Sequence, residues 1–231
     1  MKIAGTILAL LCIGYCFGLI QTGYFLSKIK GVDIKHQGSG NSGATNTLRV
    51  MGVKSGLIVL FGDILKSVLP CLAVRYLFGN WGLGWAPDMS QAYVLIMGLG
   101  VVLGHNYPFY LGFRGGKGIA STGGIAIAFD WRTAVVGLTL FFIVVLITKY
   151  VSVGSMTGVA TFCIMGIVFT ALRLGTPYRA LCGTGQIVLY VTAVILIASA
   201  AYSHRANWKR LANGTENKFG SGKKKDEETE V

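Results

Sequence analysis

Long apolar segments, separated by short polar stretches, run through almost the whole chain of 231 residues. Hydrophobic residues make up 53% of it and charged residues only 13%, against about 25% charged in a soluble domain. Because this apolar excess is spread over the chain, the sequence predicts an all-α polytopic membrane protein with seven transmembrane helices. The expected helices cover residues 3–24, 55–78, 91–103, 118–129, 133–148, 153–172 and 186–202.

Two of these segments, 91–103 and 118–129, are shorter than the roughly 17–25 residues that usually cross a bilayer. We expect them to be tilted, surrounded by a thinned bilayer, or shielded by neighbouring helices. The alternative is that they are re-entrant pieces that do not cross the membrane.

The distribution of lysine and arginine predicts the orientation. With seven crossings, fifteen cations fall on the side that holds both polar loops and the C-terminus, and five fall on the other side. The positive-inside rule therefore places the C-terminus in the cytoplasm and the N-terminus outside. The loop 79–90, which has two Trp and no Lys or Arg, suits the outer interface. If 118–129 and 133–148 formed one broken helix, the second polar loop and the tail would lie on opposite faces.

Composition also excludes some classes. The net charge of +12 is explained mostly by that rule, and no basic helix with interleaved aromatics indicates nucleic-acid binding. The five cysteines have no metal-ligand spacing, so neither a metal site nor a cofactor is expected. Gly14 and Gly18, and likewise Gly100 and Gly104, have the spacing of closely packed membrane helices, although glycine is common enough here for chance.

Residues 38–49 form the first of two glycine-rich polar stretches between the apolar segments. Such a stretch cannot bury itself by apolar contact, and its small side chains together with its backbone N–H groups suit phosphate. Arg49, at its end, can clamp a phosphate through two parallel hydrogen bonds. The alternative is a surface turn cluster. The predicted binding residues here are Ser39, Asn41, Ser42, Gly43, Asn46 and Arg49.

The second polar stretch, 104–118, ends where an apolar helix is expected to begin. Free backbone N–H groups and Lys117 would converge on an anion at that helix N-terminus. The spacing fits neither a Walker A loop nor a dinucleotide fingerprint, so ATP hydrolysis is not indicated. A basic connector is the alternative. The predicted binding residues are His105, Gly115, Gly116, Lys117 and Gly118, with a structural or a catalytic role left open for His105.

Three further groups of polar residues lie in or beside the apolar segments. Asp63 and Lys66, three residues apart, are expected to pair inside the bundle, with a role in orienting the loop cations as the alternative. Ser155 is a candidate for substrate binding, because one serine would be enough to cap the sixth helix. His204 and Asn207 follow the last segment, and His204 is the best-placed titratable base.

Together these residues resemble the acyl-phosphate:glycerol-3-phosphate acyltransferase (PlsY) family of bacterial membrane enzymes. The resemblance covers about residues 3–218, and Arg114 keeps the charge where many members carry Lys. The matching stretches are residues 39–49, 104–109, 113–118, 204–207 and 210–216, with weaker likeness at 63–66 and 151–155.

The resemblance implies a seven-helix enzyme that moves an acyl chain from acyl phosphate to the 1-hydroxyl of glycerol 3-phosphate. The product would be lysophosphatidic acid, in the first acylation of phospholipid synthesis at the bacterial inner membrane. It implies a functional partner, the enzyme that makes acyl phosphate, and membrane lipids as surroundings. It also implies substrate-site roles for Ser39, Arg49, Lys117, Ser155, His204 and Asn207.

Within that reading we take His204, Asn207, Lys117 and Arg49 as the catalytic residues. Either His204 or a phosphate oxygen of the donor removes the proton of the attacking hydroxyl. The expected organisation is a membrane catalytic domain over 1–203, a cytoplasmic motif segment over 204–219 and a disordered charged tail over 220–231. The competing class is a membrane transporter of an organophosphate.

Overall fold

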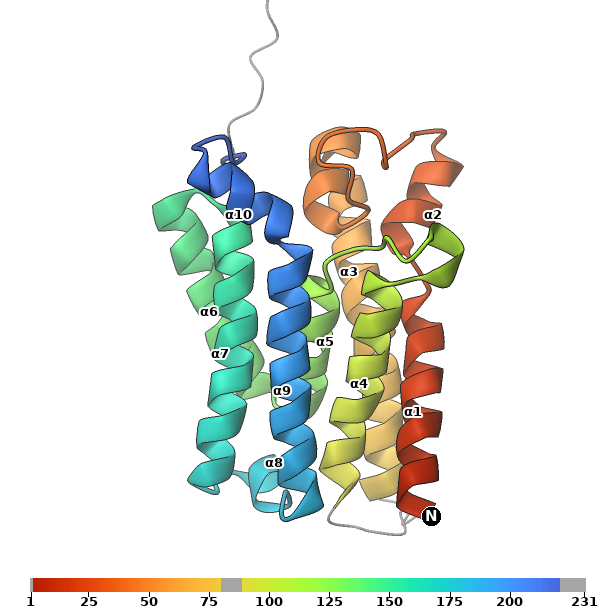
Figure 1. Ribbon diagram of the computed structural model, residues 1–231, viewed down its shortest axis with the longest axis vertical. Coiled ribbons are helices and arrows are strands. Elements are labelled where there is room, and N and C mark those ends of the chain that lie inside the picture. Colours follow the sequence, from red (N-terminus) through yellow and green to blue (C-terminus); the bar gives the residue numbers. More distant parts are fainter. Residues whose placement is uncertain (1, 80–88, 221–231) are drawn as a thin grey trace, which may run out of the picture.

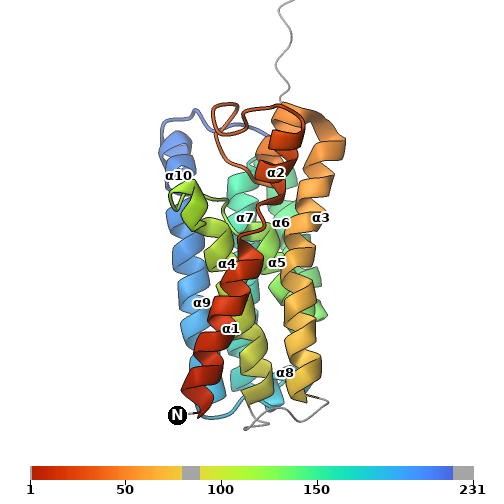
Figure 2. The same ribbon diagram turned by 90° about the vertical axis from the view of Figure 1, so that its right-hand side faces the viewer.

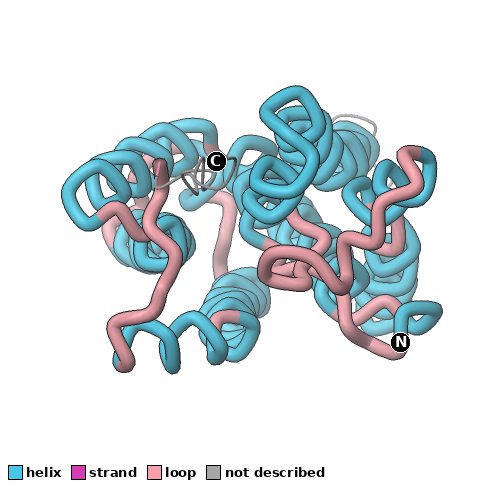
Figure 3. Tube along the Cα trace, turned by 90° about the horizontal axis from the view of Figure 1, so that it is seen from above, coloured by secondary structure: helices cyan, strands magenta, loops and turns pink. Residues whose placement is uncertain are grey.

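The structure is a computed structural model that describes residues 2–79 and 89–220. Within those residues every regular element is a helix and none is a strand (Figures 1 and 3), which confirms the all-α prediction. The elements are α1 (Lys2–Gly18), α2 (Thr22–Ile29), α3 (Ala44–Gly79), α4 (Ser90–Asn106), η2 (Phe109–Leu111), α5 (Ile119–Phe129), α6 (Trp131–Thr148), α7 (Val151–Ala171), α8 (Thr176–Arg179), α9 (Thr184–Ser203) and α10 (Arg205–Ala212).

The long helices stand side by side, and the two ends of the bundle differ in what they carry (Figures 1 and 2). α2, α10 and the two polar loops gather at one end, whereas α8 and the start of α1 lie at the other. The first helix therefore begins at the end opposite to α10. The predictions for the outer loop and the charged tail fall largely on residues 80–88 and 221–231, outside the described residues.

Six helical stretches among the described residues are long and apolar enough to cross a membrane, and α5 is an additional short apolar helix. The 11 residues of α5 rise only about 16 Å, roughly half the hydrocarbon thickness, as its shortness in sequence predicted. The stretch over 91–103 is longer than predicted. It runs from Ser90 to Asn106 because the polar side chains of His105 and Asn106 are buried at its end rather than exposed in a loop.

The first predicted helix, 3–24, is in fact interrupted between α1 and α2. A break inside a bundle exposes carbonyl groups that other residues must satisfy. Here the Ile20 carbonyl accepts a hydrogen bond from Lys66 Nζ at 2.7 Å, and the Leu19 carbonyl accepts one from the Tyr110 hydroxyl at 2.5 Å. Beyond the interruption, α2 continues to the end of the bundle where the polar loops lie (Figure 2).

The first polar stretch is a loop only as far as Gly43. α3 begins at Ala44, so the second half of the predicted loop, including Arg49, is helical. This helix changes direction at Gly52, whose φ of 82° lies in the left-handed region that glycine adopts without steric cost. The sequence-based start at residue 55 therefore located the straight part of α3 and missed its first turns.

Four glycines form the seam between α1 and α4, and this confirms the predicted close approach of helices. A Cβ at Gly14 would lie 2.3 Å from the Met97 carbonyl oxygen, and one at Gly104 would lie 2.1 Å from the Tyr15 carbonyl oxygen. Gly18 and Gly100 are equally crowded by backbone of the opposite helix. No side chain larger than hydrogen fits there, so the two backbones touch directly and fix the position of the C-terminal end of α4.

Candidate active site

The loop between η2 and α5 folds back over the end of α4. The N–H groups of Gly115 and Gly116 donate to the carbonyl oxygens of Asn106 and His105, each at 3.0 Å. These two N–H groups are therefore occupied, and the prediction that they are free for an anion is wrong in this conformation. The N–H groups of the first turn of α5, which have no partner within their own helix, remain for that purpose.

Lys117 lies at the centre of the candidate site. Its ammonium donates to Asn207 Oδ1 at 2.5 Å, which joins the second polar loop to α10. Burial lowers the pKa of Lys117 to about 8, the Glu216 carboxylate raises it, and the cations Arg210 and Arg49 lower it further. Arg49 is exposed but within electrostatic reach of Lys117, so the two loops and α10 contribute charge to one region.

The Glu216 carboxylate holds this region together. Oε1 accepts hydrogen bonds from Asn207 Nδ2 at 2.6 Å and Ser152 Oγ at 3.0 Å, and Oε2 accepts one from Arg210 Nε at 2.8 Å. Burial alone would raise the pKa of Glu216, but these hydrogen bonds outweigh it and hold that pKa below its ordinary value. The carboxylate thus ties α10 to α7 and orients the amide that receives Lys117.

Sequence reasoning gave Glu216 no role beyond its place in a motif. One signal was available: Glu216 is the only acidic residue between Asp130 and Asp226, and it follows several cations. A lone carboxylate in such a cationic segment is expected to be paired and ordered. Its partner Ser152 is the second residue of α7, whose N-cap residue is Tyr150, and the Ser152 hydroxyl donates to Glu216.

His204 lies at the junction of α9 and α10 with 1% of its surface exposed. Its Nδ1 is 2.8 Å from the Ala200 carbonyl oxygen, and because a carbonyl only accepts, Nδ1 carries the proton. Nε2 therefore keeps a lone pair. Burial lowers the pKa of His204 to about 4, and the nearby charge of Lys117 contributes, so the imidazole is neutral at neutral pH.

The first polar loop is organised by its own asparagines. Asn46 Oδ1 accepts from the Ser39 N–H at 2.8 Å, while Asn46 Nδ2 donates to the carbonyls of Gln37 and Asn41 at 3.0 and 2.9 Å. Asn41 Oδ1 accepts from the Gly43 N–H at 2.8 Å. These amides shape the loop and leave the Ser39 side chain exposed at its edge.

Two contacts join the first polar loop to the second. Lys35 Nζ donates to the Arg114 carbonyl at 2.6 Å, and Asn41 Nδ2 donates to the Gly115 carbonyl at 3.4 Å. The predicted binding residues of both loops consequently lie at one end of the bundle. Ser155, one turn beyond Ser152 on α7, is buried there and donates to the Val151 carbonyl at 2.8 Å.

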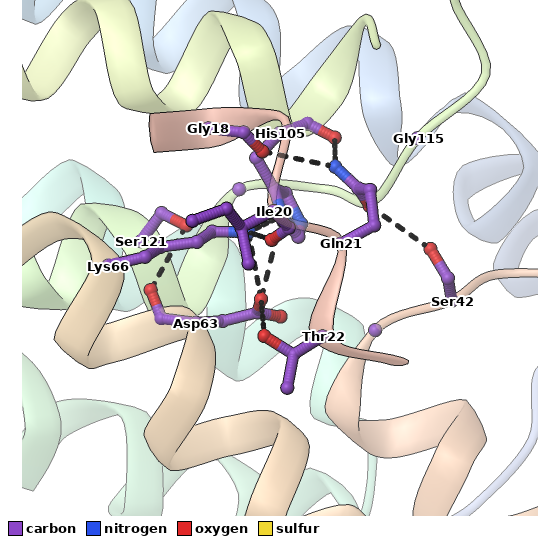
Figure 4. A network of polar contacts seen from close by, with 12 residues as sticks. Gly18, Ile20, Gln21, Thr22, Ser42, Asp63, Lys66, His105, Gly115 and Ser121 are labelled. Atoms are coloured by element: carbon purple, nitrogen blue, oxygen red, sulfur yellow. Dashed lines mark hydrogen bonds and ion pairs between the residues drawn. The ribbon is translucent and has the colours of Figure 1, made fainter. Parts of the chain in front are cut away.

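His105 lies beneath the second loop rather than in it. Figure 4 shows it beside Asp63 and Lys66, which form an ion pair at 2.8 Å with both side chains 3% exposed. The predicted pairing of Asp63 and Lys66 inside the bundle is thus confirmed. Ser42 is connected to the same cluster through Gln21: its hydroxyl donates to Gln21 Oε1 at 3.4 Å, and Gln21 Nε2 donates to the His105 carbonyl.

An all-helical bundle with six apolar stretches long enough to cross a membrane in the described part of the chain, and with a polar, charged cluster at one end, has the architecture of an integral membrane protein. Comparison with known proteins supplies the chemistry. The family model described as glycerol-3-phosphate acyltransferase matches residues 8–214. A relative named glycerol-3-phosphate acyltransferase from Thermoanaerobacter pseudethanolicus is 38% identical over 209 residues, 90% of this chain and 93% of the relative. One of the same name from Clostridioides difficile is 39% identical over 212 residues, 91% of this chain and 94% of the relative.

Solved structures agree with these relatives. A crystal structure of PlsY (YgiH), an integral membrane glycerol 3-phosphate acyltransferase in its glycerol 3-phosphate form, superposes with a TM-score of 0.77 at 32% identity. The match covers 93% of this chain and 96% of that one. The lysophosphatidic acid form of the same enzyme gives a TM-score of 0.74, again at 32% identity, covering 93% and 95% of the two chains.

The chain belongs to the glycerol-3-phosphate acyltransferase family, and it is an enzyme of the acyltransferase class. This agrees with the resemblance read from the sequence and favours the enzyme over the transporter alternative.

Proposed function

We propose that the protein transfers an acyl chain from acyl phosphate to the 1-hydroxyl of glycerol 3-phosphate. The bond between the acyl carbon and the phosphate oxygen breaks, and an ester bond to the glycerol oxygen forms. Inorganic phosphate leaves with the electron pair, and lysophosphatidic acid is the product. This reaction is the first acylation of phospholipid synthesis, fed by the enzyme that makes acyl phosphate.

The observation that carries the proposal is the hydrogen-bonded chain that joins Lys117 to Asn207, Asn207 to Glu216 and Glu216 to Arg210 at one end of the bundle. Arg49 adds a third cation within electrostatic reach of Lys117. Donor and acceptor each bring a phosphate with roughly −1.5 to −2 charges, so a site for both needs several cations. One buried carboxylate, Glu216, offsets only part of this charge. The remaining positive charge stabilises the donor phosphate as negative charge develops on it during departure.

The individual roles follow from position. Arg49 and Ser39, exposed at the edge of the first polar loop, bind the phosphate of one substrate. Lys117 and the first turn of α5 bind the phosphate that leaves. Asn207, fixed by Glu216, and His204, whose Nε2 carries a lone pair that can accept a hydrogen bond, hold the glycerol hydroxyls. Ser155 borders the same region from α7, and holding the reactants in line supplies much of the rate.

The proton of the attacking hydroxyl passes to an oxygen of the donor phosphate. The lowered pKa of His204, about 4, makes its imidazole a weak base, which favours an oxyanion of the donor phosphate as the proton acceptor. A His204→Gln enzyme that folds normally should keep near-normal turnover at saturating glycerol 3-phosphate, whereas a collapse of kcat in the folded variant would assign the proton to His204.

The cation count of the sequence supports an orientation with the site on the cytoplasmic face, and the bacterial inner membrane is the location that goes with the proposed reaction. With seven crossings, α5 is one of them, and the loop that folds over α4 leads directly into its N-terminus. Glycerol 3-phosphate, a charged and water-soluble substrate, would reach the site from the cytoplasm, and the acyl chain would lie along apolar helix surfaces.

The test uses the purified protein in detergent with acyl phosphate and radiolabelled glycerol 3-phosphate. We expect lysophosphatidic acid and phosphate in equal amounts, and no product from acyl-CoA. Lys117→Ala protein, prepared in parallel, controls for contaminating acyltransferases. Product formation from acyl-CoA but not from acyl phosphate would refute the proposed donor.

A further inference from the structure

A buried polar network lies directly beneath the second polar loop, inside the bundle (Figure 4). The Lys66 ammonium has three N–H donors, and all three are used: they reach Asp63 Oδ1 at 2.8 Å, the Ile20 carbonyl at 2.7 Å and His105 Nδ1 at 2.6 Å. Since an ammonium can only donate, His105 Nδ1 accepts and the ring proton is on Nε2. Lys66 thus sets both the tautomer and the orientation of His105.

The other edge of this imidazole supports the loop. A Cβ at Gly116 would lie 1.9 Å from His105 Nε2, and a Cβ at Gly115 would lie 2.0 Å from the His105 carbonyl oxygen. The two glycines therefore lie flat against His105, and their N–H groups donate to the carbonyls at the end of α4. Lys117 is the next residue along the chain, so the imidazole fixes where its backbone starts.

The network extends to both sides of this contact. Gln21 Nε2 donates to the His105 carbonyl at 2.8 Å, and Thr22 Oγ1 donates to Asp63 Oδ1 at 3.1 Å. At the start of α5, Ser121 Oγ donates to the Asp63 carbonyl at 3.3 Å. The loop that carries Lys117 is consequently held at its beginning by His105 and at its end by Asp63.

We propose that Asp63, Lys66 and His105 are positioning residues for acyl transfer: the ion pair locks the imidazole, and the imidazole is the platform that places Lys117 against its substrate phosphate. The proposal rests on the function proposed above. A charged pair buried within a membrane bundle is costly unless it is fully satisfied, and such groups mark functional sites. Here the partners of the Lys66 ammonium are Asp63, the Ile20 carbonyl and His105, so the pair reaches Lys117 only through His105 and the loop that rests on it.

Two single variants perturb the platform from opposite sides. His105→Asn keeps an oxygen where Nδ1 accepts from Lys66 and removes the ring edge beneath Gly116. Gly116→Ala keeps the ring and adds a methyl group that collides with Nε2. We expect each to lower kcat about 10–100-fold, since a displacement of about 1 Å costs on that order. Gly123→Ala, on α5 with no atom within 4 Å of the added Cβ, is the matched control.

The double variant His105→Asn with Gly116→Ala is the decisive comparison. The added methyl group enters the space that the ring edge leaves, so we expect kcat above that of Gly116→Ala alone. If the fold-loss in kcat of the double variant equals the product of the two single losses, residues 105 and 116 act independently. This outcome would overturn the proposal.

A second measurement uses no substrate. The rate at which a water-soluble amine reagent modifies Lys117, followed by peptide mass spectrometry across pH, gives the pKa of that lysine. For the protein without substitutions we expect a titration midpoint near pH 8. In either single variant, and in the double variant Asp63→Asn with Lys66→Met, the midpoint should shift toward 10.5, because a displaced Lys117 reaches water. Folded variants that are less active but have an unchanged midpoint would overturn the positioning role. Absence of product from acyl phosphate refutes only the proposed reaction, because the labelling does not depend on it.

Discussion

Replacing Glu216 by glutamine tests how much the site depends on one carboxylate. The substitution keeps size and shape but turns one oxygen into an amide nitrogen, which donates instead of accepting. If the remaining oxygen keeps the hydrogen bonds from Asn207 and Ser152, the new NH2 group faces Arg210 Nε. In the protein without the substitution, Arg210 Nε donates to a carboxylate oxygen at 2.8 Å. Two donors then oppose each other at the junction between α10 and the following loop.

The magnitude follows from the bond that is lost. A hydrogen bond to a charged group contributes about 1.5–3 kcal/mol. The side chain of Arg210 is 32% exposed, so solvent screens part of this and about 1–2 kcal/mol remains. At 1.36 kcal/mol per factor of ten, kcat/KM should fall roughly 5–30-fold through displacement of Asn207 and Lys117. The free energy of unfolding should fall by a similar amount.

The assay combines steady-state kinetics with denaturation in one detergent. Asp33→Asn is the control, because the Asp33 side chain is 62% exposed and accepts hydrogen bonds from the exposed His36 and from the Lys35 N–H rather than from any residue of the site. The pKa of Glu216 is lower folded than its ordinary 4.5, so its contribution to stability is present above about pH 4.5 and is lost as pH falls through the folded value. The Gln variant should lack this loss. Unchanged activity and an unchanged acid transition would refute the reasoning.

Three further outcomes are expected. Lys117→Ala and Arg49→Ala should each lower kcat/KM by several orders of magnitude. A normal rate in either variant would show that the substituted residue does not bind a substrate phosphate. In the unmodified chain, kcat/KM should fall about tenfold per pH unit above pH 8, because Lys117 loses its charge as pH rises through its lowered pKa of about 8; a rate that is constant to pH 10 would contradict this. Gly104→Ala should lower the free energy of unfolding by about 1–3 kcal/mol through overpacking against the Tyr15 carbonyl, whereas Gly5→Ala, with open space around it, should change the melting temperature little.

The parts of the fold that could be predicted from sequence are those determined locally. Apolar segments predicted the long helices, and two pairs of glycines four residues apart predicted a close approach of helices without indicating that α1 and α4 are the two that meet. The interruption between α1 and α2 could not be predicted, because the carbonyl of Ile20 is satisfied by Lys66, 46 residues further along the chain. An apolar pattern does not record such distant partners, so it continues through the break.

The candidate site shows the same division. Lys117 and Asn207 were identified because charged and polar residues are conspicuous beside membrane segments, and the structure joins them. Asn46 shapes its loop through partners within nine residues, but which of the polar residues there would do so is not encoded in residue type. Glu216 is central partly because it accepts from Ser152, 64 residues away in the sequence. Residue type alone therefore indicated which side chains belong to the site but not which of them hold the others in place.

The bond from His204 Nδ1 to the Ala200 carbonyl has a consequence for reading variants at this position. The ring has two separate duties: Nδ1 terminates α9 and directs the chain into α10, and only Nε2 is left for substrate. Asparagine reproduces the donor at Nδ1, and glutamine reproduces the group at Nε2. His204→Asn therefore keeps the corner of the chain without the substrate contact, and His204→Gln does the reverse. An alanine variant loses both groups, so a fall in its activity does not distinguish a lost contact at the end of α9 from a lost contact with the substrate.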